Sequence, residues 1–320
     1  MFKPAGLAIA ISVAMIAATP AANAATVLTL EGAFVGLQPI WHYAPQQLQG
    51  DLCKSPNHCQ PVDYVAFPGA SFNAAGATKV QQAIDALPSD EQIVLFGYSQ
   101  GGQVVYTALR RFAADPANAP DPARLSWVSI GNPENPYGGR RPKTETAAQP
   151  WLPPHTAYTG TEVIRQYDGW ADWPDDTRNL LAVANAVVGM FSIHNDYRRV
   201  DLDAPTNVRF TPDVNGQPGN VTYVWVPTKT LPLVAWAGPL APALDKQLRP
   251  IIEKAYHRPV NIPDPNAPAP AATRPVRTPA VPTRSAASSK RAGAKTSPAK
   301  QHSTPIRKAK SSTGSSARGR

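Results

Sequence analysis

Apolar and polar positions between residues 25 and 256 form a repeating series of strand-like and helix-like segments. Apolar runs rich in β-branched and aromatic residues predict buried strands, and these runs span 26–32, 62–69, 91–99, 124–133 and 161–169. Strands that are apolar on both faces are typical of a parallel sheet with helices on both sides. The pattern therefore predicts an α/β fold with a mostly parallel central sheet.

Two segments between these strands have helical spacing. In 77–87, the side chains of Val80, Ile84 and Leu87 fall on one face, and 101–115 repeats this spacing of apolar residues. Helices between successive strands fit a parallel sheet, because its neighbouring strands are joined by crossovers.

The pattern changes after residue 200. Residues 207–227 predict two strands around a turn that contains Asn215 and Gly216. Residues 241–256 predict a closing helix, which Pro250 is expected to kink or split because proline lacks the backbone N–H.

The N-terminus predicts an export signal. Lys3 precedes an apolar run at 5–18, and the small residues of "ANA" at 22–24 offer a cleavage site. This run is shorter than a membrane-spanning helix requires. The expected organisation is therefore a signal peptide at 1–24 and an exported mature chain, secreted or associated with the cell envelope, without a transmembrane helix.

The basic charge lies in the C-terminal segment. Residues 261–320 carry twelve Lys and Arg and one Asp, which gives this segment a net charge of +11. The net charge of the whole chain is +9, so the residues before 261 have a net charge of −2. The richness of the C-terminal segment in Pro, Ala, Ser, Lys and Arg predicts a disordered tail that follows a folded domain at 25–260. Behind an export signal, the expected partners are acidic envelope polymers or lipids, not nucleic acid. A solvated spacer without a specific partner is the alternative.

The two cysteines, Cys53 and Cys59, lie six residues apart. In an exported chain this spacing predicts a disulfide. A metal site that includes His58 is the less favoured alternative, because an oxidising compartment disfavours free thiolates. No metal or other cofactor is expected.

The segment "GYSQG" at 97–101 fits the G-x-S-x-G pattern. A predicted strand precedes it and a predicted helix follows it, which is the context of a nucleophile elbow. Ser99 is then the candidate nucleophile, and the backbone N–H of Gln100 is a candidate oxyanion donor. The alternatives are a plain glycine-rich turn or a phosphate loop, although the Gly-Lys-Ser/Thr ending of a nucleotide P-loop is missing.

In this architecture the base follows the acid along the chain. His194 lies after the strand that is expected to deliver the acid, and it is therefore the favoured base. The other histidines precede Ser99, precede that strand, or lie beside or within the tail: His42, His58, His155, His257 and His302.

Two carboxylates follow the predicted strand at 161–169 and are candidates for the acid that orients His194. Asp172 is favoured because it lies deeper in the loop. Asp168 stands directly at the strand end, and holding the loop through backbone N–H groups is its other expected role. Two further acids fit the start of the next helix better: Asp175 and Asp176.

A second oxyanion donor is expected from the loop after an early strand. The backbone N–H of Ala33, within 30–36, is the first candidate. The glycine-containing segment at 67–72 is the alternative.

Together these segments resemble the PE-PPE domain family of mycobacterial serine α/β-hydrolases, which are relatives of the cutinases. The resemblance covers about residues 26–256 and rests on four segments: 97–102, 166–174, 194–197 and 230–236. It implies that Ser99, Asp172 and His194 form the triad and that Tyr197 matches a tyrosine that follows the cutinase histidine. A signal peptide in place of the PE or PPE leader, the basic tail and the "LEGAF" loop depart from the family pattern.

The resemblance implies esterase or lipase activity on fatty acyl esters through an acyl-enzyme. The alternative is transfer of the acyl group to trehalose-type envelope glycolipids, as is implicated for some members of the family. A non-catalytic envelope-binding protein is the third hypothesis. The apolar segment 180–191 is either one wall of an acyl-chain site or a core-facing helix.

Overall fold

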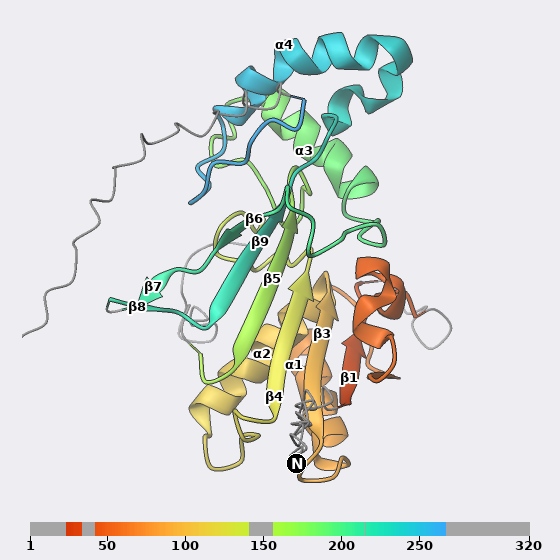
Figure 1. Ribbon diagram of the computed structural model, residues 1–320, viewed down its shortest axis with the longest axis vertical. Coiled ribbons are helices and arrows are strands. Elements are labelled where there is room, and N and C mark those ends of the chain that lie inside the picture. Colours follow the sequence, from red (N-terminus) through yellow and green to blue (C-terminus); the bar gives the residue numbers. More distant parts are fainter. Residues whose placement is uncertain (1–23, 34–41, 141–155, 215, 267–320) are drawn as a thin grey trace, which may run out of the picture. The chain divides into compact units, whose positions relative to one another are not determined.

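A computed structural model describes residues 24–33, 42–140, 156–214 and 216–266 (Figure 1). Residues 1–23, His155 and the tail from residue 267 lie outside the described residues, and so do the expectations that concern them.

A seven-stranded sheet forms the centre of the domain, with strand order β2-β1-β3-β4-β5-β9-β6. All neighbouring strands are parallel except β6, which runs antiparallel to β9. The strands are β1 (Ala25–Leu30), β2 (His58–Pro61), β3 (Gln92–Tyr98), β4 (Leu125–Ile130), β5 (Thr159–Arg165), β6 (Val208–Phe210) and β9 (Val221–Val226). The predicted α/β fold with a mostly parallel sheet is confirmed.

The two faces of the sheet are covered differently. Alternate residues along a strand face opposite sides, so Leu95 packs under α1 (Ala70–Asp85) and α2 (Gln100–Ala114), while Phe96 faces the other side. That second side is covered by two short 3-10 helices and the chain after His194. The 3-10 helices are η2 (Ala44–Gln46) and η3 (Leu48–Cys53).

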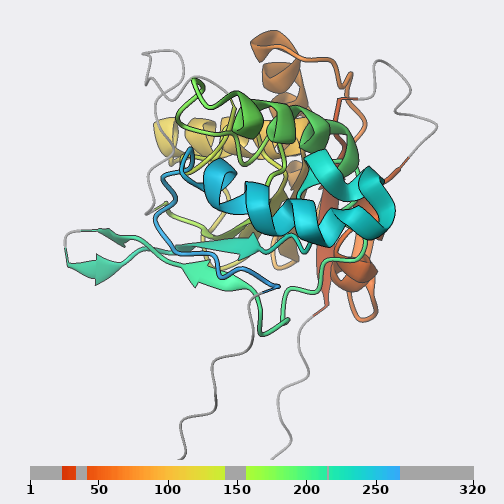
Figure 2. The same cartoon turned by 90° about the horizontal axis from the view of Figure 1, so that it is seen from above.

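A third group of helices lies beyond the carboxyl ends of the strands (Figures 1 and 2). It consists of α3 (Leu180–Ser192), η4 (Pro232–Leu240) and α4 (Ala241–Glu253), which pack against one another around a small apolar core. We call this group the helical cap. No helix in the described ranges is long and apolar enough to cross a membrane.

The strand predicted at 62–69 is wrong. The edge strand is β2, and its register with β1 ends at the pair Thr29 and Pro61. Beyond it the N–H of Val62 still bonds the carbonyl of Thr29. Val62, Tyr64 and Ala66 are buried and alternate with exposed residues, so the pattern reports the burial of a segment that follows the strand.

Two further elements differ in detail from the prediction, and a third matches it. Helix α3 begins at Leu180 and not at Asp175, because the side chain of Asn179 caps it by accepting from the N–H of Ala182. Helix α4 continues through Pro250, where the carbonyl left without its helical donor belongs to the exposed Lys246. The predicted hairpin forms, with β7 (Asp213–Val214) and β8 (Gln217–Pro218) at its tip.

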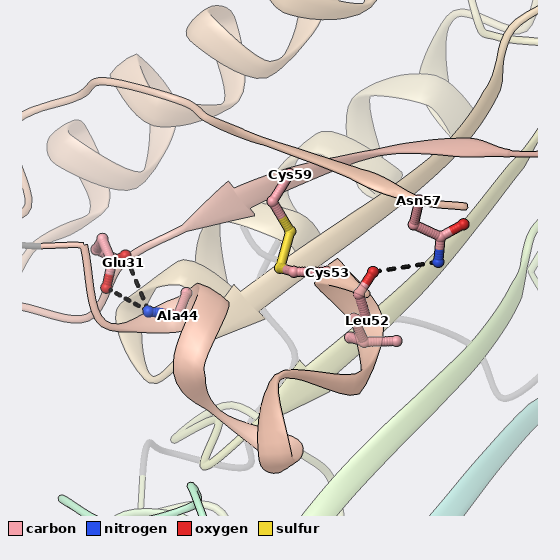
Figure 3. Close-up of a disulfide and its surroundings, with 6 residues drawn as sticks. All are labelled: Glu31, Ala44, Leu52, Cys53, Asn57 and Cys59. Atoms are coloured by element: carbon pink, nitrogen blue, oxygen red, sulfur yellow. Dashed lines mark hydrogen bonds between the residues drawn. A yellow bond between two sulfur atoms is a disulfide. The ribbon is translucent and has the colours of Figure 1, made fainter. Parts of the chain in front are cut away.

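The predicted disulfide between Cys53 and Cys59 is present and joins η3 to β2, with the two Cα atoms 5.3 Å apart (Figure 3). Nearby, both carboxylate oxygens of Glu31 accept from the N–H of Ala44, at 3.0 and 3.1 Å. The disulfide and Glu31 therefore attach the η2–η3 segment to the sheet at two points.

A carboxyl group is buried inside the sheet. Glu162 of β5 is fully buried, and its Oε2 accepts from the hydroxyl of Tyr106 at 2.8 Å and from Asn132 at 3.3 Å. Burial raises the pKa of Glu162 from its ordinary 4.5 to about 8, although these hydrogen bonds oppose the rise. The folded protein therefore keeps a proton here that the unfolded chain releases.

We predict that this proton makes stability fall as pH rises. The folded pKa exceeds the unfolded one, so the stabilisation is complete below about pH 4.5 and is lost as pH rises toward 8. One proton limits the slope to about 1.4 kcal/mol per pH unit. In Glu162→Gln this contribution disappears, and urea unfolding between pH 5 and 9 should show a flatter profile.

Asp90→Asn, which changes an exposed carboxyl group, is the matched control and should keep the wild-type profile. Parallel profiles for wild type and Glu162→Gln would contradict the prediction.

Candidate active site

Ser99 lies at the turn between β3 and α2. Its backbone has φ 55° and ψ −113°, a conformation that non-glycine residues rarely adopt. The N–H of Ser99 donates to the carbonyl of Ile130 on β4 at 2.8 Å, and the N–H of Gly102 donates back to the carbonyl of Ser99 at 3.0 Å. This geometry is that of a nucleophile elbow, in which the strained turn holds the hydroxyl at the carboxyl edge of the sheet.

The turn is possible because glycine occupies the point where α2 meets β1. A Cβ atom on Gly101 would lie 2.1 Å from the carbonyl oxygen of Leu30, and one on Gly97 would lie 2.6 Å from the backbone of Gly101. The first turn of α2 therefore packs directly on backbone, with no room for a side chain between them.

His194 connects Ser99 to a buried carboxylate. Its Nε2 lies 2.8 Å from Ser99 Oγ, and its Nδ1 lies 2.9 Å from both carboxylate oxygens of Asp168. Asp168 is fully buried and His194 is 6% exposed. A serine hydroxyl, an imidazole and a carboxylate are thus joined in one hydrogen-bonded series, in the chain order Ser, Asp, His.

The structure corrects the sequence-based choice of acid, which favoured Asp172. Asp168 faces His194, whereas Asp172 turns away and pairs with Arg258 through two bonds of 2.9 and 2.6 Å. The reason is the tight turn after β5, in which the N–H groups of Ala171 and Asp172 both bond the carbonyl of Asp168. The distance of an aspartate from the strand end therefore does not show whether its carboxylate contacts His194.

Two tyrosines hold the histidine and the acid in place. The hydroxyl of Tyr98 donates to the carbonyl of His194 at 2.8 Å, and the two rings stack with centroids 5.6 Å apart. The hydroxyl of Tyr197 donates to Asp168 Oδ2 at 2.7 Å and accepts from the N–H of Arg165 at 3.2 Å. The tyrosine singled out by the family resemblance thus contacts the carboxylate itself.

The chain after His194 also pairs with the disulfide-bonded segment. The N–H groups of Leu48 and Gln49 donate to the carbonyls of Tyr197 and Arg198 at 3.0 and 2.9 Å, and Gln47 Oε1 accepts from the N–H of Tyr197 at 3.0 Å. Leu48 and Gln49 both have positive φ. Sequence reasoning missed this support, because nothing in the local pattern links residues 150 positions apart.

The carboxylate of Asp172 belongs to a buried polar network beneath the loop 166–173, which follows β5, carries Asp168 and Asp172, and is called the acid loop here. Arg258, which bonds Asp172, also bonds Glu253 at 2.8 Å and stacks on the ring of Tyr256, 4.1 Å from its centroid. Burial raises the pKa of Asp172, and the guanidinium of Arg258 opposes that rise. Both side chains of the pair are nearly inaccessible to solvent.

This network supports the residue that precedes the acid. Tyr167 has φ 67°, which is unfavourable for an aromatic residue. Its N–H donates to Asp172 Oδ2 at 2.7 Å, and its hydroxyl bonds Glu253 and accepts from Arg249 at 3.2 Å. Asp172 therefore stabilises the backbone that presents Asp168.

The proposed oxyanion donors lie close to Ser99. Gln100 is the first residue of α2, where N–H groups have no acceptor within the helix. A Cβ on Gly32 would lie 3.1 Å from Ser99 Cβ, so the backbone that leads to Ala33 runs beside the nucleophile. The alternative segment, 67–72, contacts the side chain of Gln100, because Nε2 of Gln100 donates to the carbonyl of Phe67. Donation by Gln100 and Ala33 stays a prediction.

Two of the other described histidines make contacts outside the triad. His257 donates its backbone N–H to Asp175 at 2.7 Å, and His58 begins the edge strand β2. Within the part of the chain that the structure describes, no three His, Cys, Asp or Glu side chains form a group that could hold a metal ion.

The sheet order, the elbow at Ser99 and the position of His194 in the connection between the parallel strands β5 and β9 define an α/β-hydrolase fold. The family model of the PE-PPE domain matches residues 49–257. The chain belongs to the PE-PPE domain family.

Several curated proteins of Mycobacterium tuberculosis are similar in sequence. Esterase PE16 is 32% identical over 221 residues, which are 64% of this chain and 41% of that protein. SL1278 acyltransferase Chp1 is 30% identical over 252 residues, 69% of this chain and 60% of that protein. Diacyltrehalose acyltransferase Chp2 is 30% identical over 187 residues, 51% of this chain and 50% of that protein. The chain thus matches between 41% and 60% of the length of these relatives.

Two solved structures show weaker similarity. A cutinase-like protein from Cryptococcus sp. is 20% identical, with a TM-score of 0.35, and the match covers 47% of this chain and 79% of that chain. The catalytic core domain of acetyl xylan esterase from Trichoderma reesei is 17% identical, with a TM-score of 0.32, and the match covers 48% of this chain and 88% of that chain.

We predict that Gly101→Ala destabilises the fold, although alanine is the better helix former by about 1 kcal/mol. The added methyl group would lie 2.1 Å from the carbonyl oxygen of Leu30, and overpacking of this kind costs about 1–3 kcal/mol or more. Thermal unfolding measures the change. Gly216→Asn, at a position with positive φ and open space, should leave the midpoint nearly unchanged, and an unchanged Gly101→Ala midpoint would contradict the packing argument.

We also predict that Asp172→Asn destabilises the protein by about 1.5–3 kcal/mol, because the buried guanidinium of Arg258 loses one of its two carboxylate partners and keeps only the bond to Glu253. Urea unfolding at neutral pH measures the loss. Asp176→Asn removes a carboxylate that pairs with Arg178 at the surface and should change stability little. Equal stability of the two variants would show that the Asp172 pair contributes nothing.

Proposed function

We propose that this protein is a serine hydrolase that cleaves carboxylic esters through an acyl-enzyme. The observation that carries the proposal is the hydrogen-bonded series from Ser99 Oγ through His194 to Asp168. In this proposal Ser99 is the nucleophile, His194 the general base and Asp168 the group that orients the imidazole. Asp172 acts only through the loop, as a positioning residue.

The reaction follows from these positions. His194 Nε2 accepts the proton of Ser99 Oγ as the oxygen attacks the ester carbonyl, and a tetrahedral oxyanion forms. Collapse of this intermediate breaks the bond to the alcohol, which takes the proton from the imidazolium and leaves an ester on Ser99. Asp168 stabilises the imidazolium and holds Nδ1–H toward itself. A water molecule, activated in the same way, then releases the acid and restores the hydroxyl.

The oxyanion would be stabilised by the backbone N–H groups of Gln100 and Ala33. The N-terminus of α2 supports this role, because its N–H groups and the helix dipole favour negative charge beside Ser99. Removing one such donor typically costs about a hundredfold to a thousandfold in rate.

The similarity to esterase PE16 supports hydrolysis of acyl esters, with fatty acyl esters as the proposed substrate class. Acyl transfer is the second candidate function, and a specific observation favours it: Chp1 and Chp2 are named acyltransferases, and Chp1 is matched over 60% of its length. In transfer, a sugar hydroxyl replaces water as the acceptor, with trehalose-type glycolipids as the proposed acceptors. Chemically, the two reactions share every step up to the acyl-enzyme.

Products distinguish these two candidates. Purified protein would be incubated with a medium-chain acyl ester, with and without trehalose, and free acid and acylated sugar would be quantified. Free acid as the main product in both reactions supports the esterase. A predominance of acylated trehalose would reject the plain esterase and support transfer.

We propose that a fluorophosphonate modifies Ser99 in the folded protein and that Ser99→Ala abolishes both labelling and ester hydrolysis. Asp168→Asn should lower kcat by about a thousandfold to ten-thousandfold, because the neutral amide no longer stabilises the imidazolium. Mass spectrometry of the labelled peptide and steady-state kinetics measure these effects.

Asp172→Asn serves as the internal comparison. If its loss of kcat matched or exceeded that of Asp168→Asn at a temperature where both stay folded, the assignment of the acid would fall. Failure of the fluorophosphonate to modify folded wild-type protein would favour the third hypothesis, a non-catalytic envelope-binding protein.

We also propose that the protein is exported and that its basic tail contacts acidic envelope polymers or lipids. The apolar run near the N-terminus and the disulfide between Cys53 and Cys59 support export, because disulfides persist in oxidising compartments. A chain that ends at Asn266 should lose envelope association, whereas unchanged association would remove the tail from the proposal.

A further inference from the structure

Large apolar side chains are unusually exposed on the helical cap. Among the described residues, ten such side chains are exposed, and seven of them lie on α3, η4 and α4. The most exposed are Trp236 at 83%, Leu180 at 76% and Phe191 at 73%. The other four are Leu181, Val187, Leu240 and Ile251. Exposed apolar residues are common singly, whereas a concentration on packed neighbouring elements marks an interaction surface.

Helix α3 is apolar on its outer side as well as its inner side. Its inner residues pack on the acid loop so closely that a Cβ on Gly189 would lie 1.9 Å from the carbonyl oxygen of Tyr167. On the outer side, Leu180, Val187 and Phe191 follow helical spacing and are exposed. A surface helix normally has polar or charged residues there, and an all-apolar helix is normally buried in protein or lipid.

The charges of this region fit a hydrocarbon environment. Residues 179–195 and 231–244, which contain α3 and η4, include no Asp, Glu, Lys or Arg. The side chain of Asn185 bonds the N–H of Leu233 at 3.0 Å, which fixes the two uncharged segments to each other. Contact with acyl chains would therefore require no desolvation of a charged side chain on either segment, a cost that normally opposes burial in hydrocarbon.

The uncharged helix α3 lies directly before the candidate base in the chain. Helix α3 ends at Ser192, two residues before His194. Trp170, which is 38% exposed, lies in the acid loop with its ring centroid 6.3 Å from that of His194. Phe191 and Trp170 are therefore exposed apolar side chains three and two residues from His194 and Asp168, and the guanidinium of Arg140 lies 5.7 Å from the centroid of the Trp170 ring. Figures 1 and 2 show α3 and α4 side by side at the carboxyl end of the sheet, where Ser99 also lies.

We propose that the helical cap is a docking surface for a lipid layer and that Trp236, Phe191 and Leu180 enter its acyl-chain region. Trp and Phe side chains on the uncharged elements α3 and η4 are typical of peripheral attachment at the boundary between headgroups and acyl chains. Docking there holds the entrance of the triad against the layer, so an acyl ester reaches Ser99 without crossing water. The inference rests on the proposed ester hydrolysis. Its consequence is that the substrate is an ester held in a lipid aggregate and not one dissolved in water.

The experiment compares binding and turnover in the full chain. The probe is a phosphatidylcholine vesicle, which carries no net charge and so excludes attraction of the basic tail. The triple variant Leu180→Gln/Phe191→Gln/Trp236→Gln changes only exposed side chains outside the triad and its supports. Val65→Gln, at an apolar residue that is 60% exposed but lies outside the cap, is the matched control.

In vesicle co-sedimentation we expect wild type and Val65→Gln to bind and the triple variant to bind at least about tenfold more weakly, because three large apolar side chains no longer leave water. Turnover of a water-soluble short-chain ester should be equal in all three proteins. Turnover of a long-chain ester held in the vesicles should fall in the triple variant in proportion to its bound fraction.

Three results would overturn the docking proposal: wild type that does not bind the vesicles, a triple variant that binds as wild type does, or a concentration-dependent dimer of wild type that the triple variant dissociates, which would make a second copy the occupant. The failure of the proposed function looks different. In that case the triple variant still binds vesicles more weakly than wild type does, but wild type turns over neither the soluble ester nor the ester held in vesicles.

Discussion

The direct contact between the first turn of α2 and the backbone of β1 is the constraint on which the site depends. Since Gly101 meets the carbonyl of Leu30 without a side chain between them, the chain must reverse direction within one residue. That residue is Ser99, whose strained backbone sends its hydroxyl outward at the edge of the sheet. The bonds to β4 and to Gly102 stabilise this backbone conformation, so the fold itself fixes the position of the Ser99 hydroxyl.

The acid loop shows how two carboxylates four residues apart take different roles. Both are buried, and burial is unfavourable for a carboxylate without a partner. Asp168 forms hydrogen bonds with the imidazole of His194 and the hydroxyl of Tyr197, whereas Asp172 pairs with the guanidinium of Arg258. Each carboxylate is satisfied, and the second holds the strained Tyr167 that presents the first. Arg258 lies just after the residues that the family model matches, so this support comes from the segment that follows α4.

The helical cap joins the supports of the site to the proposed lipid surface. Its inner side packs on the acid loop through glycine contacts, and its outer side exposes apolar residues without a nearby charge on α3 or η4. One helix, α3, therefore has two constraints: close backbone packing toward the triad and compatibility with hydrocarbon outside. Both constraints favour small and apolar residues, which explains why the segment resembles a core helix in sequence while it lies at the surface.

The sequence by itself determined the elements whose periodicity is strong and the residues whose motifs are local. The sequence determined β1, β3, β4 and β5, helices α1 and α2, the disulfide, the elbow at Ser99 and the choice of His194, which follow from apolar runs, spacing and chain order. Only the tertiary structure decided which neighbour each buried group meets: the edge strand is β2 and not 62–69, and Asp168, not Asp172, faces His194. Periodicity reports which side of an element is buried, but the reach of a carboxylate depends on a turn and on Arg258, 86 residues away. Such pairings arise from folding in three dimensions, and no local pattern encodes them.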